Sequence, residues 1–357
     1  MRSSKHKSWL LFLFILGSAF AKAQSTTTTI TGKIIDEITS EPLMGVAVYI
    51  SGTSIGVVSG PDGDFSIEYS QEYNSPLVFS FLGYEKKQLA DPVSFDTSII
   101  KLSMQENDLE AVVINPDPWD RTTKERLFRE TFIGLNSLEH TKILNMSQVR
   151  LRFNPETKQL TAWSNNPIRI YNEQLGYLID YDLVEFELNF RKIPSDSQIQ
   201  RSYDVEHAYR NYVQTSSYRA GSSFYQDAHD VDITKRKWRR RRNKAFRQSS
   251  LNLFRVISRE TWEESKFKLF SKGFKVDPEK HIRSKKIVDG YQVAFRNKRY
   301  SVKDRSGHQT DFSLSTNYLY IDDYGNNLTS REIRLSGYIA KLGVGGMMPL
   351  DYEVIEK

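Results

Sequence analysis

Short runs of alternating apolar and polar residues dominate the chain between positions 29 and 102. Turns that contain glycine or proline separate these runs at intervals of roughly ten residues. Seven strands are predicted, at Thr29–Ile35, Val46–Ile50, Ile55–Ser59, Phe65–Tyr69, Leu77–Phe81, Glu85–Leu89 and Ser98–Leu102. The pattern predicts a small β-sandwich, in which the nearly continuous apolar run Leu77–Phe81 takes a central position.

The turn between the third and fourth of these strands has a specific chemistry. Pro61 presets the first central dihedral angle of the turn, and Gly63 can adopt a positive φ without a Cβ clash. We therefore predict a hairpin loop at Gly60–Asp64.

Beyond residue 103 the pattern changes character. Residues 104–118 are expected to be a linker with one short strand at Asp108–Ile114, which ends at Asn115-Pro116-Asp117-Pro118. A capping box at Thr122–Glu125 then predicts a helix that ends near Asn136. Its apolar face would carry Leu127, Phe128, Thr131, Phe132 and Leu135.

The rest of the chain reads as a β-rich α+β domain over residues 119–357. Strands are predicted at Val149–Phe153, Gln159–Trp163, Ile168–Tyr171, Tyr177–Phe190, Tyr291–Phe295, Tyr318–Ile321 and Ser330–Leu335. The alternation in Tyr177–Phe190 slips by one position at Leu183 and Val184, which predicts a bulge or a sharp bend. The last two strands are expected to form a hairpin through Asp322–Asn327.

A second helix is predicted near residues 235–259. A narrow packed stripe is expected from residues that recur at helical spacing, Trp238, Arg242, Ala245, Ser249, Leu253 and Val256. Its first turns hold nine cations, Lys235, Arg236, Lys237, Arg239, Arg240, Arg241, Arg242, Lys244 and Arg247. Cations are unfavourable at the N-terminal end of a helix, so a counter-charge is expected. It could come from acidic strands of the same domain, including Glu185 and Glu187, or from an anionic partner.

The N-terminus has the pattern of a secretory signal peptide over residues 1–23. Basic residues precede a short apolar core at Trp9–Leu16, and Ala21-Lys22-Ala23 has the small residues of a cleavage site before Gln24. The apolar core is shorter than a membrane-spanning helix requires, and no later stretch is long enough. The chain contains 0 cysteines, so neither a lipid anchor at the cleavage site nor a disulfide is expected.

Charge adds one local feature to this picture. The full chain carries a formal net charge of +6, and removal of residues 1–23 would leave 46 basic against 44 acidic side chains. The cluster at Lys235–Arg247 therefore accounts for the excess of basic over acidic side chains in the whole protein. The remainder has the charge of an ordinary soluble protein. Nucleic acid is not expected as a partner of an exported protein.

No catalytic constellation is apparent in the sequence. None of the 6 histidines begins a His-x-x-Glu pair, so the ligands of a zinc carboxypeptidase are missing. No nucleophile motif and no phosphate-binding glycine loop is present. Neither a metal nor a cofactor is expected. Two acidic clusters are better explained as solvated loops or turns: Asp227, His229, Asp230 and Asp232, and Asp322, Asp323, Asn326 and Asn327.

Two further patterns leave alternatives open. Glu185 and Glu187 share one strand face and could imitate the carboxylate pair of a glycosidase, although polar alternation beside a buried face predicts the same spacing. The tyrosines Tyr171, Tyr177, Tyr181, Tyr203, Tyr209, Tyr212 and Tyr218 could line a carbohydrate or peptide groove. A β-rich core with tyrosines at its polar boundary would look the same, and we favour that interpretation.

Residues 28–103 resemble the carboxypeptidase-regulatory-like family of transthyretin-like, seven-stranded domains. The resemblance rests on turn residues, Pro42-Leu43, Gly45-Val46, Gly52-Thr53, Asp62-Gly63-Asp64-Phe65 and Gly83-Tyr84. In that family these residues shape turns and pack the sandwich, so the resemblance implies a fold of the Ig/transthyretin type and no catalysis.

The remainder is similar to exported proteins known only as carboxypeptidase-like regulatory domain-containing. That similarity rests on phrases such as Phe132-Ile133-Gly134, Leu175-Gly176-Tyr177, Tyr181-Asp182-Leu183 and Met348-Pro349-Leu350-Asp351-Tyr352. The phrase Leu109-x-x-Val112-Val113 also resembles the segment after this sandwich in TonB-dependent outer-membrane receptors. The residues that follow Ser103 are too few for the barrel of such a receptor.

The sequence therefore predicts a mainly β protein with a sandwich at residues 25–103. Its expected role is non-enzymatic, as a binding or structural protein of the cell envelope, in the periplasm or at the outer membrane. Expected partners are an envelope protein, an anionic lipid or a glycan. Two alternatives are an accessory or transducing partner of a TonB-dependent receptor and a glycan-active enzyme.

Overall fold

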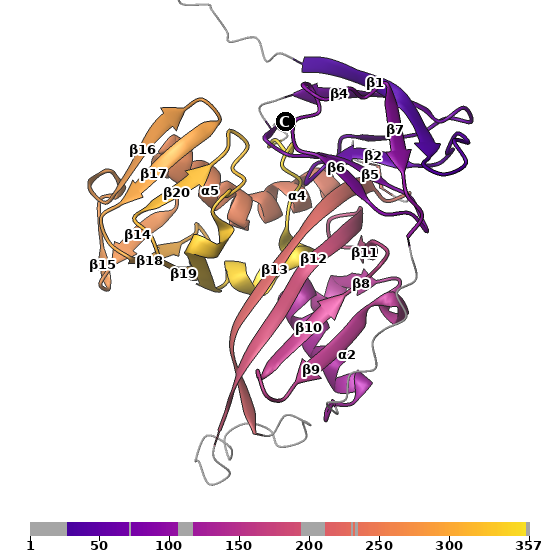
Figure 1. The fold of residues 1–357 in the computed structure, drawn as a ribbon. Coiled ribbons are helices and arrows are strands. Elements are labelled where there is room, and N and C mark those ends of the chain that lie inside the picture. Colours follow the sequence, from indigo (N-terminus) through magenta and orange to yellow (C-terminus); the bar gives the residue numbers. More distant parts are fainter. Residues whose placement is uncertain are drawn as a thin grey trace, which may run out of the picture.

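The computed structural model describes residues 27–70, 73–105, 117–193, 211–229, 231–232 and 235–354. The signal peptide at residues 1–23, the strand at Asp108–Ile114 and most of the linker lie outside these residues, as do Tyr203, Tyr209 and Asp230. Within them the fold is mainly β and contains five sheets (Figure 1).

The N-terminal module is a sandwich of two sheets. The first has the order β4 (Asp64–Ser70), β1 (Thr27–Asp36) and β7 (Ile99–Leu102), and β1 pairs with β7 in parallel. The second has the order β3 (Gly56–Val58), β2 (Ala47–Ile50), β5 (Leu77–Ser80) and β6 (Lys87–Leu89). All seven predicted strands are present, and the apolar strand β5 lies inside its sheet as predicted.

The predicted hairpin at Gly60–Asp64 is wrong in its connectivity. Strands β3 and β4 belong to different sheets, so this loop carries the chain from one layer of the sandwich to the other. The turn chemistry nevertheless holds, because Gly63 has a φ of +76°. Local turn residues fix the shape of a loop and do not decide which strands pair on either side of it.

Gly63→Val is expected to lower the free energy of unfolding by about 1–3 kcal/mol, because a β-branched residue is strained at positive φ. A Cβ at this position would also lie 2.3 Å from the carbonyl oxygen of Ile34. Gly83 provides the matched control, since its φ is +84° but no atom lies within 4 Å of its Cβ position. Urea unfolding of Gly63→Val measures this loss. In the matched alanine pair, Gly63→Ala should lose more stability than Gly83→Ala, and equal losses would contradict the predicted steric clash.

The middle of the chain forms a strongly curved six-stranded sheet. Its order is β8 (Thr141–Ile143), β11 (Ile168–Asn172), β12 (Tyr177–Lys192), β10 (Gln159–Trp163) and β9 (Arg150–Asn154), with β13 (Tyr212–Asp227) on the other edge of β12. The pairing of β12 with β13 shifts register between Leu183 and Glu185. The predicted phase slip is therefore a β-bulge, and it leaves Val184 exposed.

The first helix of this region differs from the prediction at both ends. Helix α2 (Arg121–Arg129) is capped by Asp120, whose side chain accepts a hydrogen bond from the backbone N–H of Thr123, and the expected cap Thr122 lies inside it. The chain then widens into a π-helix, η3 (Glu130–Gly134). Because the wider turn shifts the helical phase, Leu135 is exposed instead of joining the apolar face.

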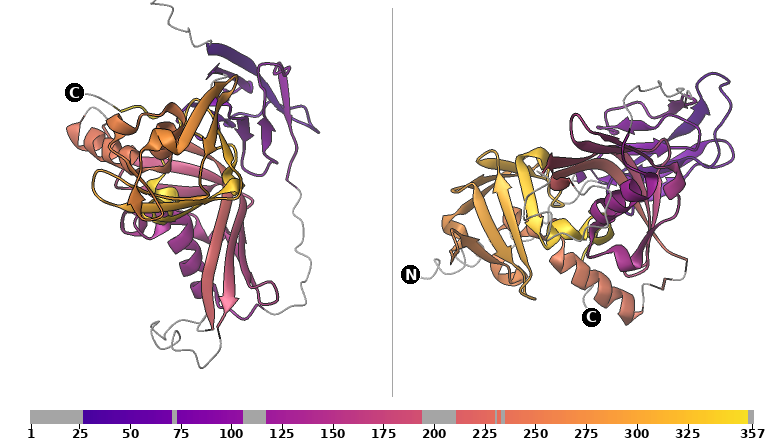
Figure 2. Two further views of the ribbon diagram at one scale, coloured as in Figure 1. Left: turned by 90° about the vertical axis from the view of Figure 1, so that its left-hand side faces the viewer. Right: turned by 90° about the horizontal axis from the view of Figure 1, so that it is seen from below.

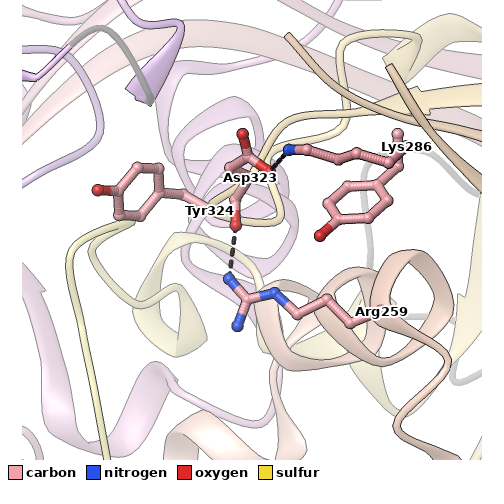
Figure 3. Close-up of a pocket in the computed structure, with 5 residues that line it drawn as sticks. Arg259, Lys286, Asp323 and Tyr324 are labelled. Atoms are coloured by element: carbon pink, nitrogen blue, oxygen red, sulfur yellow. Dashed lines mark hydrogen bonds and ion pairs between the residues drawn. The ribbon is translucent and has the colours of Figure 1, made fainter. Parts of the chain in front are cut away.

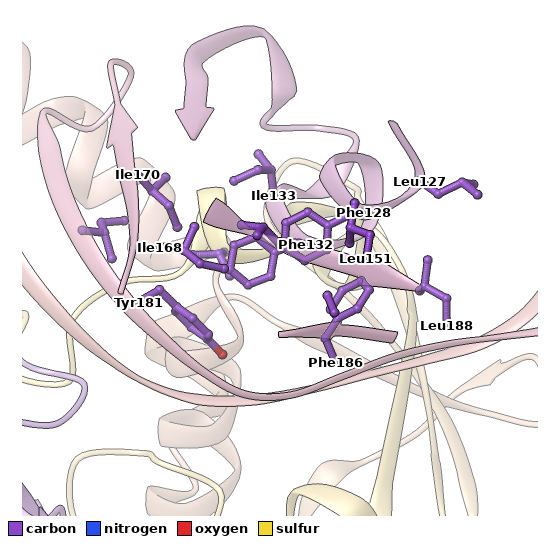
Figure 4. Close-up of a cluster of buried hydrophobic side chains, with 14 of the residues drawn as sticks. Leu127, Phe128, Phe132, Ile133, Leu151, Ile168, Ile170, Tyr181, Phe186 and Leu188 are labelled. Carbon is purple, nitrogen blue, oxygen red and sulfur yellow. The ribbon is translucent and has the colours of Figure 1, made fainter. Parts of the chain in front are cut away.

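The face of α2 and η3 that is buried covers the concave side of the curved sheet (Figure 4). The ring of Phe128 lies 4.8 Å from that of Phe186, and the ring of Phe132 lies 5.1 Å from that of Tyr181, both edge to face. This cluster also takes in Val344, Met348 and Tyr352 from the C-terminal segment. Short 3₁₀ turns connect the elements here: η4 (Leu138–His140), η5 (Met146–Gln148), η8 (Ile339–Leu342) and η9 (Val344–Gly346).

The region predicted as one β-rich domain holds a second hydrophobic cluster, which includes Leu253, Leu269, Val293 and Leu319. Two sheets surround it. One has the order β15 (Phe274–Lys275), β14 (Lys268–Ser271), β18 (Arg299–Lys303), β19 (Gln309–Leu314) and β21 (Ile333–Gly337). The other has the order β16 (Ile282–Ile287), β17 (Gly290–Phe295) and β20 (Tyr318–Ile321).

The expected hairpin between the last two predicted strands is also wrong. Strand β20 pairs with β17, whereas β21 pairs with β19, and the 3₁₀ turn η7 (Ser330–Glu332) replaces the first half of the predicted strand. A further 3₁₀ turn, η6 (Pro278–Lys280), precedes β16.

The single helix predicted near residues 235–259 is two helices, α4 (Arg236–Gln248) and α5 (Ser250–Arg259), followed by the short α6 (Trp262–Ser265). Ser249 ends α4 with an extended backbone, and its hydroxyl accepts a hydrogen bond from the N–H of Asn252 to cap α5. The predicted packed stripe is confirmed at Trp238, Arg242, Ser249, Leu253 and Val256, which are buried, whereas Ala245 is half-buried. Among the described residues, no helix combines the length and the apolar character needed to cross a membrane.

Candidate binding surface

Helix α4 lies at the periphery of the molecule, where it is anchored by one face (Figure 2). Trp238, Arg242 and Phe246 are buried and recur every fourth residue, which defines that face. The hydroxyl of Tyr352 donates a hydrogen bond to Asn243 Oδ1 at 2.6 Å, and the ring of Tyr352 lies against Phe246. Helix α4 is therefore packed against the rest of the protein along this face.

Arg242 is an internal group and does not belong to the exposed part of the predicted cationic patch. Its guanidinium donates to the carbonyl oxygens of Leu175 at 2.8 Å and Gly176 at 3.0 Å, and to Asp227 Oδ1 at 2.6 Å. The same group lies 3.9 Å from the centre of the Tyr177 ring. Arg242 thus ties α4 to the turn that begins β12.

The other cations of the predicted patch lie outside this anchor. Exposed side chains are those of Lys235, Arg236, Lys237, Arg240, Arg241, Lys244 and Arg247, and Arg239 is half-buried. Arg236, Arg240, Lys244 and Arg247 follow one another along a single row, on the side of α4 opposite to Arg242. The first turn contains no acidic residue and no side chain caps it. Across the part of the chain that the structure describes, none of these four residues forms an ion pair. We call Arg236, Arg240, Lys244 and Arg247 the cationic row.

The counter-charge expected from Glu185 and Glu187 acts on Arg331, and among the described residues neither glutamate forms an ion pair with α4. Both carboxylate oxygens of Glu185 accept from Arg331, at 2.6 and 2.7 Å, and the Arg331 guanidinium lies 4.1 Å from the centre of the Tyr218 ring. Glu185 is thereby engaged in a structural ion pair, which is a poor arrangement for the acid or base of a glycosidase.

In each acidic cluster that the sequence singled out, one aspartate has partners in the structure. Asp227 is bound by Arg242, and Asp322 Oδ1 accepts from the N–H groups of Tyr324 at 2.9 Å and Asn326 at 2.8 Å. Burial raises the pKa of Asp322 to about 6. In the described residues no three histidine or acidic side chains come together as metal ligands would.

One shallow pocket of about 320 Å³ lies near the end of α5 (Figure 3). It is lined by Arg259, Lys286, Tyr291, Asp323 and Tyr324. Lys286 forms an ion pair with Asp323, and Arg259 donates to the backbone carbonyl of Asp323. Because both cations already have partners, the pocket offers little charge to a ligand.

A polar junction between the sandwich and the curved sheet was not predicted from any sequence pattern. Asp182, on β12, is buried and accepts from the hydroxyls of Tyr49 on β2 and of Ser222 on β13, and it forms an ion pair with Lys86. Burial and the neighbouring Asp182 raise the pKa of the Tyr49 phenol above its usual range. The ring of Tyr49 also stacks on Phe224 with centres 5.0 Å apart.

The loop after β2 makes a second set of contacts at this junction. The N–H of Gly52 donates to Ser223 O at 2.7 Å, and the N–H of Tyr225 donates to Thr53 O at 3.1 Å. On its other side the loop meets the C-terminal segment, where the N–H of Leu350 donates to Gly52 O at 2.8 Å and Ser54 binds Asp351. The sandwich is therefore docked on the rest of the chain.

Comparison with known proteins assigns the sandwich. Residues 30–114 match the family model of the CarboxypepD_reg-like domain, as the turn residues predicted. TonB-dependent receptor P3 of Formosa agariphila is 28% identical over 114 residues, which are 32% of this chain and 11% of the receptor. TonB-dependent receptor SusC of Bacteroides thetaiotaomicron is 30% identical over 105 residues, 29% of this chain and 10% of the receptor. The chain thus spans about a tenth of the length of these curated relatives.

A solved structure also aligns with most of the chain. It is a Bacteroides fragilis protein described as membrane-associated and of unknown function, and the alignment covers 87% of this chain and 95% of the other at 12% identity. The TM-score is 0.16, which is too low to support an argument about fold or function.

Proposed function

We propose that this is a non-enzymatic, envelope-associated protein that binds an anionic envelope component on the exposed face of α4. The observation that carries the proposal is the cationic row, which is held in a fixed orientation by Trp238 and Arg242 and has no ion pair among the described residues. Four exposed cations in a row, without an ion pair in the part of the chain that the structure describes, attract anions. Arg236 in the first turn of α4 is in addition disfavoured by the helix dipole, so an anion beside it would be stabilising.

Envelope association draws its support from two sources. The sandwich is homologous to part of TonB-dependent receptors, and residues 1–23 have the pattern of an export signal. We propose the periplasm or the outer membrane as the location, without a lipid anchor, since the chain has 0 cysteines.

A second candidate is favoured by the same homology. The protein could act as an accessory or transducing partner of a TonB-dependent receptor, with the sandwich as the shared module. The two candidates differ in the surface they use, because the cationic row lies on α4, outside the matched residues 30–114.

Crosslinking in intact cells, followed by identification of what is captured, tests the proposal. We compare the natural protein with a variant in which Arg236, Arg240, Lys244 and Arg247 are all glutamine, the row variant. The control variant replaces Lys272, Lys275, Arg283 and Lys285, which are exposed cations on the C-terminal sheets, by glutamine. Loss of an envelope adduct in the row variant alone supports the proposal. Capture of an outer-membrane receptor by all three proteins equally would favour the second candidate and count against the first.

A further inference from the structure

The shape of the cationic row limits what can bind to it. From Arg236 to Arg247 the row is about 16 Å long, given the rise of an α-helix. The helix lies at the edge of the molecule (Figure 2), and the described pocket is formed elsewhere, by residues from Arg259 onward. The charges therefore form a line at the edge of the molecule, and a complementary ligand has to present several negative charges over a similar distance.

The surroundings of the row argue against a sugar-stacking site. Sugar rings are usually held against exposed aromatic faces, but Trp238 and Phe246 on α4 are buried. The ring of Trp238 is instead contacted by the cations Lys237 and Arg241, at 5.1 and 5.4 Å from its centre. What α4 exposes is charge carried on long, flexible stems, which suits an extended anionic surface.

We propose that α4 lies along a bilayer whose headgroups carry anionic phosphate, with the cationic row directed toward those phosphates. This inference rests on the proposed function, because it names the partner of the same face. Charge complementarity selects the membrane: polybasic rows bind anionic bilayers additively, and four aligned cations can meet several headgroups at once. Since no apolar side chain is exposed along the row, the attachment is electrostatic and reversible and needs no insertion into the hydrocarbon.

The test is sedimentation of the purified protein with vesicles. One set contains equal parts of phosphatidylglycerol and phosphatidylcholine, and the other contains phosphatidylcholine alone. We expect binding to the anionic set only, with a steep decrease as salt rises. The row variant should bind roughly 100-fold more weakly or worse, whereas the control variant, with the same change in net charge, should stay close to the natural protein. Thermal unfolding of both variants checks that neither substitution set perturbs the fold.

Each outcome bears on a specific part of the argument. Equal binding to both vesicle sets, or equal weakening by the row and control variants, would overturn the membrane assignment. Inorganic phosphate added at constant ionic strength should compete weakly. Strong competition would point to a site for a single phosphate and overturn the bilayer assignment.

Binding to soluble polygalacturonate and not to anionic vesicles would overturn the lipid inference and leave the proposed function standing. Failure of the row variant to lose either ligand would overturn both.

Discussion

Asp182→Ala is expected to lower the free energy of unfolding by about 3–5 kcal/mol. The carboxylate is buried at the junction between the sandwich and the curved sheet, where it is shared by Tyr49, Ser222 and Lys86. Its removal leaves two buried hydroxyls without an acceptor and an ammonium without its partner, and each loss has a desolvation cost. Urea unfolding monitored by tyrosine and tryptophan fluorescence measures the effect.

Asp180→Ala is the matched control for this prediction. Asp180 lies two residues away on the same strand, and its ion pair with Arg169 is longer, at 3.4 Å, with the Arg169 side chain exposed. Pairs of that kind contribute about 1 kcal/mol or less. Similar losses for the two alanine variants would show that the junction does not hold the sandwich in place.

Arg242→Gln is expected to cost about 2–4 kcal/mol of unfolding free energy, because several hydrogen bonds to a charged donor are lost at once. The substitution removes the bonds to the carbonyls of Leu175 and Gly176 and to Asp227, and the stacking on Tyr177. Arg240→Gln, two residues earlier on the exposed side of α4, should change stability by no more than about 0.5 kcal/mol. Thermal and urea unfolding of the two single variants give the comparison.

The contrast between these two arginines matters for any study of the cluster. A block substitution of Arg239–Arg242 would combine a structural loss at Arg242 with a surface change at its neighbours, so lost binding could follow from partial unfolding. If Arg242→Gln proved as stable as Arg240→Gln, the anchoring role of Arg242 would be refuted. The cationic row is therefore defined without it.

The sandwich was predicted well from the sequence because the patterns that specify its strands and turns lie within short segments of the chain. Most of its strands alternate with period two or are continuously apolar, and each connection between them has its own glycine or proline. The bulge in β12 was predicted for the same reason, since a one-residue slip moves the later apolar residues from odd-numbered to even-numbered positions. Strand β13 was missed, because residues such as Gln214, Thr215, Ser216 and Ser217 are polar on both faces. Pairing with β12, and not local pattern, makes that segment a strand.

Helix boundaries and the candidate site show where local information ends. The spacing of Trp238, Arg242, Ser249 and Val256 fits a single helix, so the break at Ser249 was hidden by the periodicity on either side of it. The nine cations were found as a group, but the burial of Arg242 depends on Leu175 and Asp227, which are distant in sequence. The contact of Tyr49 with Asp182 spans 133 positions and is set by the docking of two units.

The loop at Gly52–Ser54 gives the protein a direct route for mechanical load. It is bonded on one side to Ser223 and Tyr225 of β13 and on the other to Leu350 and Asp351 near the end of the described chain. Arg255 holds the same C-terminal segment through the carbonyls of Leu350 and Tyr352. A pull on the sandwich would therefore load the hydrogen bonds to the central sheet and, through the C-terminal segment, those to α5 at the same time.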